Sequence, residues 1–275
     1  MRVRTILLTA TLVCPSLALG QATPVGSVTL AIRVTPGSAK SAPVPLLAGG
    51  MSLRLTASSD GRRSAVTLAA DADSVGVGAL LANGWIRVVT GATDDSTDVG
   101  ISVPPGVRAM LPAPAADSIV GGYRMRFKAP ATDSVVKPDT LLKDKPTARP
   151  LGTTRIVAGA ACENWLITTA KDTVNVCLVE QNRSTAPLVQ WIVTKLHLDR
   201  SAAGHQLSTT FSGRKLLPVR FASMDSATVV ELLSASSASP ASDAFDIPAT
   251  FKLLGPDVLK NSILPALPGL IPHKP

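Results

Sequence analysis

Residues 123–128 read Tyr-Arg-Met-Arg-Phe-Lys, and this alternation constrains the fold of the chain more than any other feature. Successive side chains of a β-strand point to opposite faces of a sheet, so the run predicts a strand with three apolar side chains on one face and three cations on the other. Residues 28–34 and 51–55 alternate in the same way. One polar face favours antiparallel pairing, because parallel strands buried on both faces read as continuous apolar runs.

Turn-forming residues divide the rest of the chain into further short strands. The turns are expected at Asp60-Gly61, Asn83-Gly84, Pro104-Pro105-Gly106 and Gly121-Gly122, and the strands at 85–90, 99–103, 153–157, 215–221 and 228–233. Residues 187–198 differ, because their apolar side chains recur every three or four positions, which predicts a helix. A strand is the alternative there, since Val189, Trp191 and Val193 also alternate. The fold is therefore predicted to be mainly β, an antiparallel sheet with one or two helices.

The first twenty residues have the three parts of a secretory signal peptide. A basic start leads into an apolar stretch over 6–19, and small residues precede the cleavage that we expect after Gly20. The apolar stretch is shorter than the about 20 residues that span a membrane, and Pro15 interrupts it. We therefore expect a mature chain that begins at Gln21 and is located in the bacterial periplasm or secreted.

The mature chain is long enough to bury a sizeable core without depending on disulfides. Apolar residues make up 45% of the sequence but aromatic residues only 3%, so the core is expected to be mostly aliphatic. We expect one β-rich domain over 21–254, followed by a proline-rich tail over 255–275.

The chain is basic, with 27 Lys and Arg against 19 Asp and Glu. These basic residues are spread singly, whereas nucleic-acid binders gather them in stripes beside aromatic stacking platforms. We therefore expect no nucleic-acid partner. A weak contact with an anionic membrane surface agrees with the charge, although solubility alone explains it as well.

Two of the three cysteines belong to the mature chain. Cys14 falls in the signal peptide, and lipid attachment there is disfavoured because Val13 is bulkier than the small residue of a lipoprotein cleavage site. Residues 161–178 are predicted to form a β-hairpin in which Cys162 and Cys177 face the same side, directly opposed or one diagonal step apart. We expect a structural disulfide; a redox or metal site is the alternative, but it lacks close cysteine spacing and a neighbouring histidine.

Residues 151–162 read Leu-Gly-Thr-Thr-Arg-Ile-Val-Ala-Gly-Ala-Ala-Cys, with Trp165 and a Val-Asn-Val-Cys-Leu run at 174–178 after them. These residues resemble the G-T-x-x-I-A-G-x-x-C-x-x-W/Y … V-x-V-C core of a secreted bacterial family called domain of unknown function 4412. Residues 217–232, with Phe-Asp-Ile-Pro at 245–248, resemble the closing strands of that family and its F-x-I-P ending. The similarity covers residues 150–252.

This family is similar in architecture to the periplasmic lipoprotein carriers, in which an antiparallel sheet curls into an open half-barrel with a helix across its mouth. The resemblance implies a curved sheet with a concave, apolar cavity and a binding role, and it leaves the ligand open. One departure from the family is that Thr250 stands before Phe251 where an aromatic residue commonly follows the I-P-A element.

Motifs for catalysis are absent from the sequence. No serine lies in a G-x-S-x-G elbow, and the three histidines are far apart along the chain: His197, His205 and His273. Oxygen ligands for calcium could come from Asp94, Asp95 and Asp98, but a solvated turn is the simpler interpretation. We therefore expect a protein that is not an enzyme and has neither a cofactor nor a metal.

The expected function is binding of a lipid or another apolar ligand in the half-barrel. Its lining is predicted to come from inward-facing residues, although ordinary core packing explains them equally well: Leu30, Ile32, Leu53, Tyr123, Met125, Phe127 and Trp165. Outward cations either meet lipid phosphates or deter edge-to-edge aggregation: Arg33, Arg54, Arg124, Arg126 and Lys128. The alternative function is that of a structural or interaction protein of the cell envelope, with a filled core and no ligand.

Overall fold

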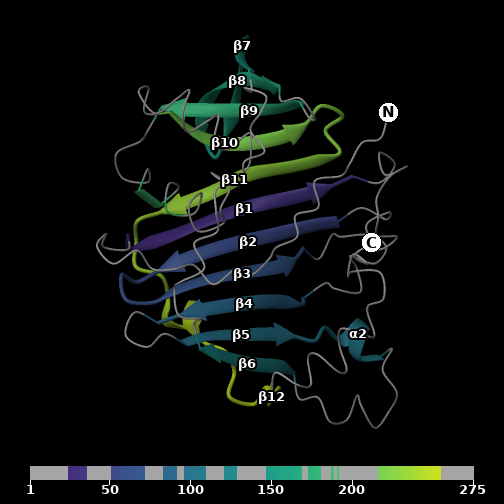
Figure 1. The fold of residues 1–275 in the computed structure, drawn as a ribbon, viewed down its shortest axis with the longest axis vertical. Coiled ribbons are helices and arrows are strands. Elements are labelled where there is room, and N and C mark those ends of the chain that lie inside the picture. The colour runs from purple at the N-terminus through teal and green to yellow at the C-terminus, as the bar shows by residue number, and fades with distance from the viewer. Residues whose placement is uncertain are drawn as a thin grey trace.

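Twelve strands form one open, curved sheet (Figure 1). The computed structural model describes residues 24–35, 51–71, 83–91, 96–109, 121–128, 147–168, 173–180, 187, 188, 191 and 216–254. The strands are β1 (Gly26–Val34), β2 (Met51–Ser59), β3 (Ser64–Ala70), β4 (Trp85–Thr90), β5 (Ser96–Ser102), β6 (Gly122–Lys128), β7 (Thr147–Val157), β8 (Ala160–Thr168), β9 (Thr173–Glu180), β10 (Leu216–Ser223), β11 (Thr228–Ser236) and β12 (Lys252–Leu253).

The sheet joins two antiparallel meanders, β1 to β6 and β7 to β11, through the pairing of β1 with β11. Its spatial order is β12-β6-β5-β4-β3-β2-β1-β11-β10-β9-β8-β7. Every pairing is antiparallel except that of the two-residue β12, which runs parallel to β6. The sheet is not closed, since β12 and β7 form its two edges. The prediction of a mainly β chain with a curved antiparallel sheet is therefore confirmed.

One face of the sheet carries rows of apolar side chains that cross the strands. The longest row follows directly from the pairing register: Leu30, Leu55, Leu68, Ile86, Ile101 and Tyr123 lie opposite one another from β1 to β6. A second row, formed in the same way, consists of Val28, Ala57, Val66, Val88, Val99 and Met125. We call this surface the inner face. Within these rows, the alternation at 28–34, 51–55 and 123–128 correctly predicted which side chains of each strand share a face.

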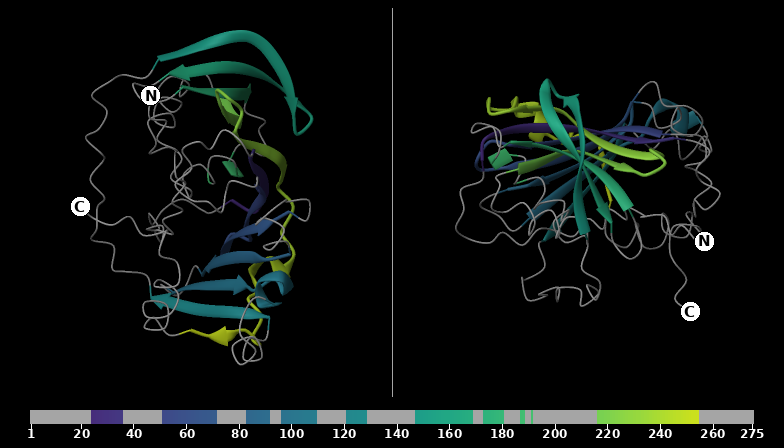
Figure 2. Two further views of the ribbon diagram at one scale, coloured as in Figure 1. Left: turned by 90° about the vertical axis from the view of Figure 1, so that its right-hand side faces the viewer. Right: turned by 90° about the horizontal axis from the view of Figure 1, so that it is seen from above.

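Part of the opposite, outer face, over β3 to β6, is covered by residues 237–254, which we call the C-terminal segment. Figure 2 shows this yellow segment along the convex side of the curved sheet. Its 3-10 turn, Ser242–Phe245, places Phe245 against Ala65 and Val89, and Phe251 stacks on Trp85 with 5.5 Å between ring centroids. Because this segment covers the outer side of β3 and β4, these two strands carry apolar side chains on both faces.

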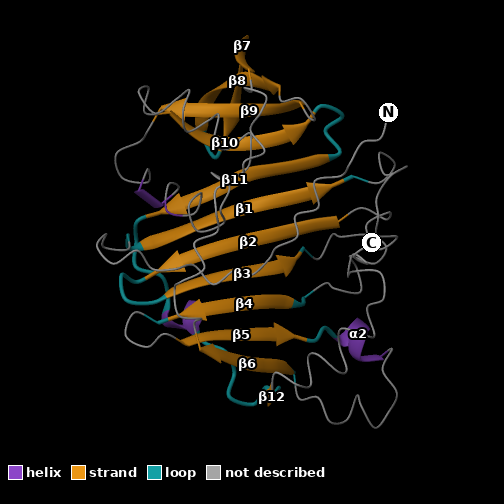
Figure 3. Cartoon of the chain, viewed as in Figure 1, coloured by secondary structure: helices purple, strands orange, loops and turns teal. Residues whose placement is uncertain are grey.

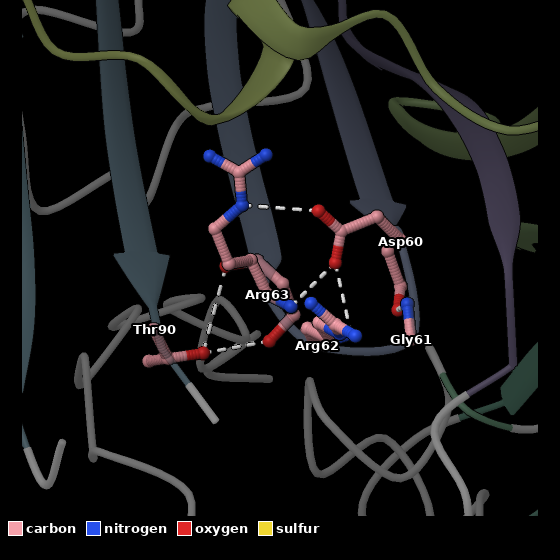
Figure 4. A network of polar contacts seen from close by, with 7 residues as sticks. Asp60, Gly61, Arg62, Arg63 and Thr90 are labelled. Atoms are coloured by element: carbon pink, nitrogen blue, oxygen red, sulfur yellow. Dashed lines mark hydrogen bonds and ion pairs between the residues drawn. The ribbon is translucent and has the colours of Figure 1, made fainter. Parts of the chain in front are cut away.

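The turn between β2 and β3 is held by a network of polar contacts (Figure 4), and its Arg63 side chain contacts the C-terminal segment. Asp60 Oδ1 accepts hydrogen bonds from the backbone N–H groups of Arg62 and Arg63 at 2.9 and 2.6 Å, and Asp60 Oδ2 accepts one from Arg63 Nε at 3.0 Å. The Arg63 guanidinium, oriented in this way, lies 4.6 Å from the centroid of the Phe245 ring. The predicted Asp60-Gly61 turn is therefore confirmed. Its Arg63 side chain also contacts Phe245, which is far away along the chain.

Hydrogen bonding also lowers the pKa of the acidic side chain in this turn. Burial alone would raise the pKa of the Asp60 carboxyl, but the backbone N–H groups of Arg63 and Arg62 and the Arg63 guanidinium together lower it below its ordinary value. Asp225, in the turn between β10 and β11, likewise has a lowered pKa, because Ser223 Oγ and the Ala227 N–H donate to it.

The β8–β9 hairpin carries the predicted disulfide. Asn164 lies opposite Cys177 in the register, so Cys162 and Cys177 are one diagonal step apart, with 5.4 Å between their Cα atoms. Both cysteines are buried, at 1% and 0% exposure. The bond therefore lies in the protein core, as the structural interpretation of this pair requires.

The helical and terminal elements differ in part from expectation (Figure 3). Pro105–Ala109 forms the short helix α2 where a turn was predicted. Pro187, Leu188 and Trp191 are helical, in agreement with the predicted helix, whose other residues lie outside the described part of the chain. Leu188 is buried in one core cluster with Val28, Ala57 and the two cysteines. Strand β3 was not predicted, and β7 begins at 147 rather than 153.

The predicted signal peptide and proline-rich tail lie outside the described residues. Among the described residues, no helix is long and apolar enough to cross a bilayer.

Candidate functional site

An apolar cavity of about 240 Å³ lies at the end of strands β2 to β5, beside helix α2. Its lining is Leu53, Leu68, Ala69, Ala70, Gly84, Trp85, Ile86, Ile101, Ser102, Val103, Pro104 and Val107. Only Trp85 and Ser102 in this set have a polar side-chain atom. The cavity therefore offers a ligand almost nothing but hydrocarbon surface.

Strand pairing and α2 explain how this cavity forms. Leu68, Ile86 and Ile101 are consecutive members of the long apolar row, and Leu53 lies opposite Ala70 in the neighbouring row. Ala70 has a small side chain, which leaves space beside Leu53 and Leu68. Pro104 begins the turn into α2, where the Arg108 N–H bonds to the Pro104 carbonyl oxygen at 2.9 Å, and this turn brings Val107 over the strands.

Ile86 is 38% exposed, although it belongs to the apolar row. Half-buried neighbours surround it, so the surface that it contributes to the cavity lacks full protein cover. Large apolar side chains that border a cavity in this way are typical of sites for apolar ligands. None of the described residues that line the cavity has a titratable side chain. The arrangement can bind an apolar group.

Of the seven residues predicted to bind a ligand, Leu53 lines this cavity. Tyr123 is the next member of the row after Ile101, and burial raises the pKa of its phenol. Met125 is buried against Val99 and Leu254. Phe127 is 36% exposed near the edge of the sheet.

The remaining predicted residues lie farther from the cavity. Leu30 and Ile32 are half-buried in β1. Trp165 is buried in a separate core cluster with Ile167 and Val176, and its indole Nε1 donates to Glu163 Oε2 at 2.9 Å. The structure thus spreads the seven residues over the whole sheet, and their role in binding stays a prediction.

Sequence reasoning missed most of the residues that do line the cavity. Strands 85–90 and 99–103 were predicted, so Ile86 and Ile101 could have been placed on an inner face from their spacing. Leu68 belongs to the unpredicted strand β3, and Val107 to the unpredicted helix α2. Bringing these four side chains together requires the strand order, which local alternation does not contain.

The outward cations do not form one patch. Arg54 lies in β2 and pairs with Asp71 at 3.0 Å, whereas Arg124 and Arg126 lie in β6, beyond three intervening strands. Arg126 forms two hydrogen bonds of 2.7 Å with Asp98. Arg33 is exposed in β1. The strands of these four arginines are therefore not all neighbours, so the four side chains do not form one shared lipid-phosphate surface.

The weaker sequence candidates are only partly visible. Asp98 lies within β5 and forms an ion pair, rather than occupying a solvated turn. Asp94, Asp95 and the three histidines lie outside the described residues. Within the described part, no group of three or more His, Cys, Asp and Glu side chains could hold a metal ion.

Comparison with known proteins adds little to this geometry. No family model and no curated protein matches the chain. The structure of PNGF-II in the C2 space group is similar with a TM-score of 0.31 and 10% identity, over 87% of this chain and 33% of that chain. The structure of PNGF-II in the P21 space group is similar with a TM-score of 0.28 and 10% identity, over 84% of this chain and 31% of that chain.

The complex of Pseudomonas aeruginosa MucA and MucB gives a TM-score of 0.34 and 13% identity, over 83% of this chain and 58% of that chain. This chain therefore spans about a third of the matched PNGF-II chains and 58% of the matched chain in the complex. Likenesses this weak carry no argument about function. The resemblance to domain of unknown function 4412 stays a prediction.

Proposed function

We propose that this protein is an exported, non-enzymatic protein of the bacterial cell envelope that binds a lipid or another apolar ligand on the inner face of its open sheet. The observation that carries the proposal is the cavity of about 240 Å³ beside α2, whose lining is almost entirely apolar. Burying apolar surface contributes about 25 cal/mol per Å², so such a lining favours hydrocarbon over any polar ligand.

The size of the cavity limits what can enter it. Sites that enclose a whole drug-sized ligand measure about 300–1,000 Å³, so this cavity fits part of a larger apolar molecule. A single hydrocarbon chain meets that condition when the rest of the molecule stays outside. The apolar row continues beyond the cavity to Leu55 and Leu30. The inner face is therefore apolar over a larger area than the cavity itself.

Export is supported by two separate features. The first twenty residues have the pattern of a signal peptide, and the Cys162–Cys177 disulfide suits an oxidising compartment such as the periplasm. The resemblance to a secreted family of half-barrel proteins agrees with both. These features support a location outside the cytoplasm without depending on the ligand.

A matched pair of lysine variants tests ligand binding. Ile86→Lys places a charge in the cavity lining, whereas Leu233→Lys changes a strand residue of the same 38% exposure that does not line it. We expect a fluorescent fatty-acid probe to bind wild-type protein and Leu233→Lys, and to bind Ile86→Lys at least about tenfold more weakly, because a buried charge opposes apolar binding.

Native mass spectrometry of protein isolated from the periplasm provides the independent readout. We expect a co-purifying apolar molecule that organic extraction removes. Absence of such a molecule, together with no probe binding by wild-type protein, would contradict the proposal and favour a structural or interaction protein without a ligand.

A further inference from the structure

A second cavity lies on the outer face, on the other side of the sheet from the apolar cavity. It measures about 400 Å³ and opens in the angle where the C-terminal segment crosses the sheet and then turns to run beside β6. Its lining is Asp98, Arg124, Met125, Arg126, Phe245, Asp246, Ile247 and Leu253. This volume falls within the about 300–1,000 Å³ of small-molecule sites.

The described residues that line the cavity include four charged groups, and three of these have a charged neighbour. Arg126 and Asp98 neutralise each other through two hydrogen bonds of 2.7 Å. The carboxylate of Asp246 lies near the Arg87 guanidinium, which also donates to the Asp246 carbonyl oxygen at 2.6 Å. Arg124 is the one charged residue of this described lining that these contacts do not include.

Arg124 is the remaining cation of this described lining. Its side chain is half-buried, and within the described part of the chain it forms neither a hydrogen bond nor an ion pair. Arg124 lies opposite Gly100, and a side chain at position 100 would meet Ile247, whose Cγ2 would be 2.9 Å from the new Cβ. Glycine at 100 therefore leaves room for the Ile247 side chain close beside Arg124.

The cavity also has an apolar wall that is incompletely covered. Leu253, in β12, is 63% exposed, and Ile247 is half-buried. Phe245 contributes to the same wall, but Arg63 lies over its ring at 4.6 Å, so the ring does not offer a free face for stacking a nucleobase. An apolar group of a ligand would shield Leu253 from water.

We propose that this outer cavity binds a small organic monoanion, a carboxylate with an apolar substituent. A planar guanidinium that has no partner among the described residues matches a carboxylate, which can accept two parallel hydrogen bonds from it. Ile247 and Leu253 hold the apolar substituent. A doubly charged phosphate is disfavoured, because Asp98 and Asp246 already have cationic neighbours and Arg124 alone of the described lining residues can neutralise a ligand charge. This site is independent of the apolar-ligand function proposed above.

Isothermal titration of the full-length, oxidised protein with four probes tests this site. Hexanoate and phenylacetate carry both required features, acetate lacks the apolar substituent, and hexanol lacks the charge. We expect hexanoate or phenylacetate to bind at least about tenfold more tightly than acetate and hexanol, since a charge-assisted bidentate contact and apolar burial each contribute. Equal binding of hexanol and hexanoate overturns the proposal, because it assigns binding to an apolar surface alone.

Variants locate the binding. Arg124→Gln is expected to weaken hexanoate binding at least about tenfold, and Arg33→Gln, an exposed arginine of β1, to leave it unchanged. Arg124→Lys retains the charge without the planar fork and is expected to give intermediate binding, which also provides a folded variant if Arg124→Gln does not fold. Unchanged affinity in both Arg124 variants, or no binding of hexanoate and phenylacetate by wild-type protein at millimolar concentration, overturns the proposal.

Discussion

The guanidinium of Arg87, in β4, donates a hydrogen bond of 2.6 Å to the backbone carbonyl oxygen of Asp243, in the 3-10 turn of the C-terminal segment. The same group donates to the Asp246 carbonyl oxygen and lies 4.9 Å from the centroid of the Trp85 ring. One side chain therefore attaches the C-terminal segment at two points to the strands beneath it. Burial lowers the pKa of this guanidinium, against the opposing attraction of the Asp243 and Asp246 carboxylates.

Replacing Arg87 is expected to loosen the C-terminal segment. Arg87→Ala removes both carbonyl contacts, and we expect the free energy of unfolding in urea to fall by about 1–3 kcal/mol. Limited proteolysis is expected to begin within residues 237–254. Arg33→Ala removes an exposed arginine of β1, so it provides the control and should change neither measurement. Equal protease resistance of Arg87→Ala and wild type would show that the segment is held by other contacts.

Gly100 and Ile247 are expected to be coupled. A Cβ at position 100 would lie 2.9 Å from Ile247 Cγ2 and 3.0 Å from Trp85 Cζ3, so Gly100→Ala should destabilise the protein by about 1–3 kcal/mol through overpacking. Ile247→Ala removes the nearer obstacle. We therefore expect the double variant to lose less stability than the sum of the two single variants, as measured by urea denaturation of all four proteins. Strict additivity would contradict the contact.

Loss of the Cys162–Cys177 disulfide is expected to lower stability substantially. The bond closes a loop with a sequence separation of 15, for which the constraint on the unfolded chain is worth about 3 kcal/mol. The variant Cys162→Ala/Cys177→Ala should lose about this amount in urea denaturation, and a reductant should destabilise wild-type protein but not the variant. Titration of unreduced, unfolded protein is the direct check: reaction of both Cys162 and Cys177 with a thiol reagent would refute the bond.

Acid is expected to weaken the turn between β2 and β3. The folded-state pKa of Asp60 is lowered from 3.8, so its ionised form contributes stability above that pH, and the contribution disappears as the pH falls through the lowered value. Asp60→Asn should therefore be less stable than wild type at pH 7, with the difference shrinking below about pH 4. Urea denaturation of both proteins at pH 7 and pH 3 measures this. A difference that stays constant over this range would rule out the titration of Asp60 as its cause.

The sequence predicted the elements whose two faces differ in polarity. In β6 the cations at 124 and 126 contrast sharply with Tyr123 and Met125, and the strand is found where it was expected. In β3 the contrast is absent, because Ala65 is covered by Phe245 from a segment far along the chain. A strand buried on both faces does not alternate, so local periodicity missed it.

The candidate cavities were predicted even less completely, because each depends on contacts between distant segments. Leu53 could be assigned to an inner face, but its proximity to Val107 depends on the strand order and on a five-residue helix. On the outer face, Arg124 could be placed on a strand, but the cover from Ile247 and Leu253 could not. The cysteine pair was predictable because a single hairpin fixes its geometry.

The pairing of β1 with β11 has a consequence for how the protein matures. A newly made chain can pair β1 through β6 as successive hairpins while the later residues are still being synthesised. The bonds from Gly26–Val34 to Thr228–Ser236 and from Tyr123 to Lys252 must wait until nearly the entire polypeptide is available. Contacts that close such long loops form slowly, so the growing half-sheet keeps an open edge at β1 during this interval. Synthesis and folding of this protein are thereby coupled: the sheet is completed only after its last strands have been made.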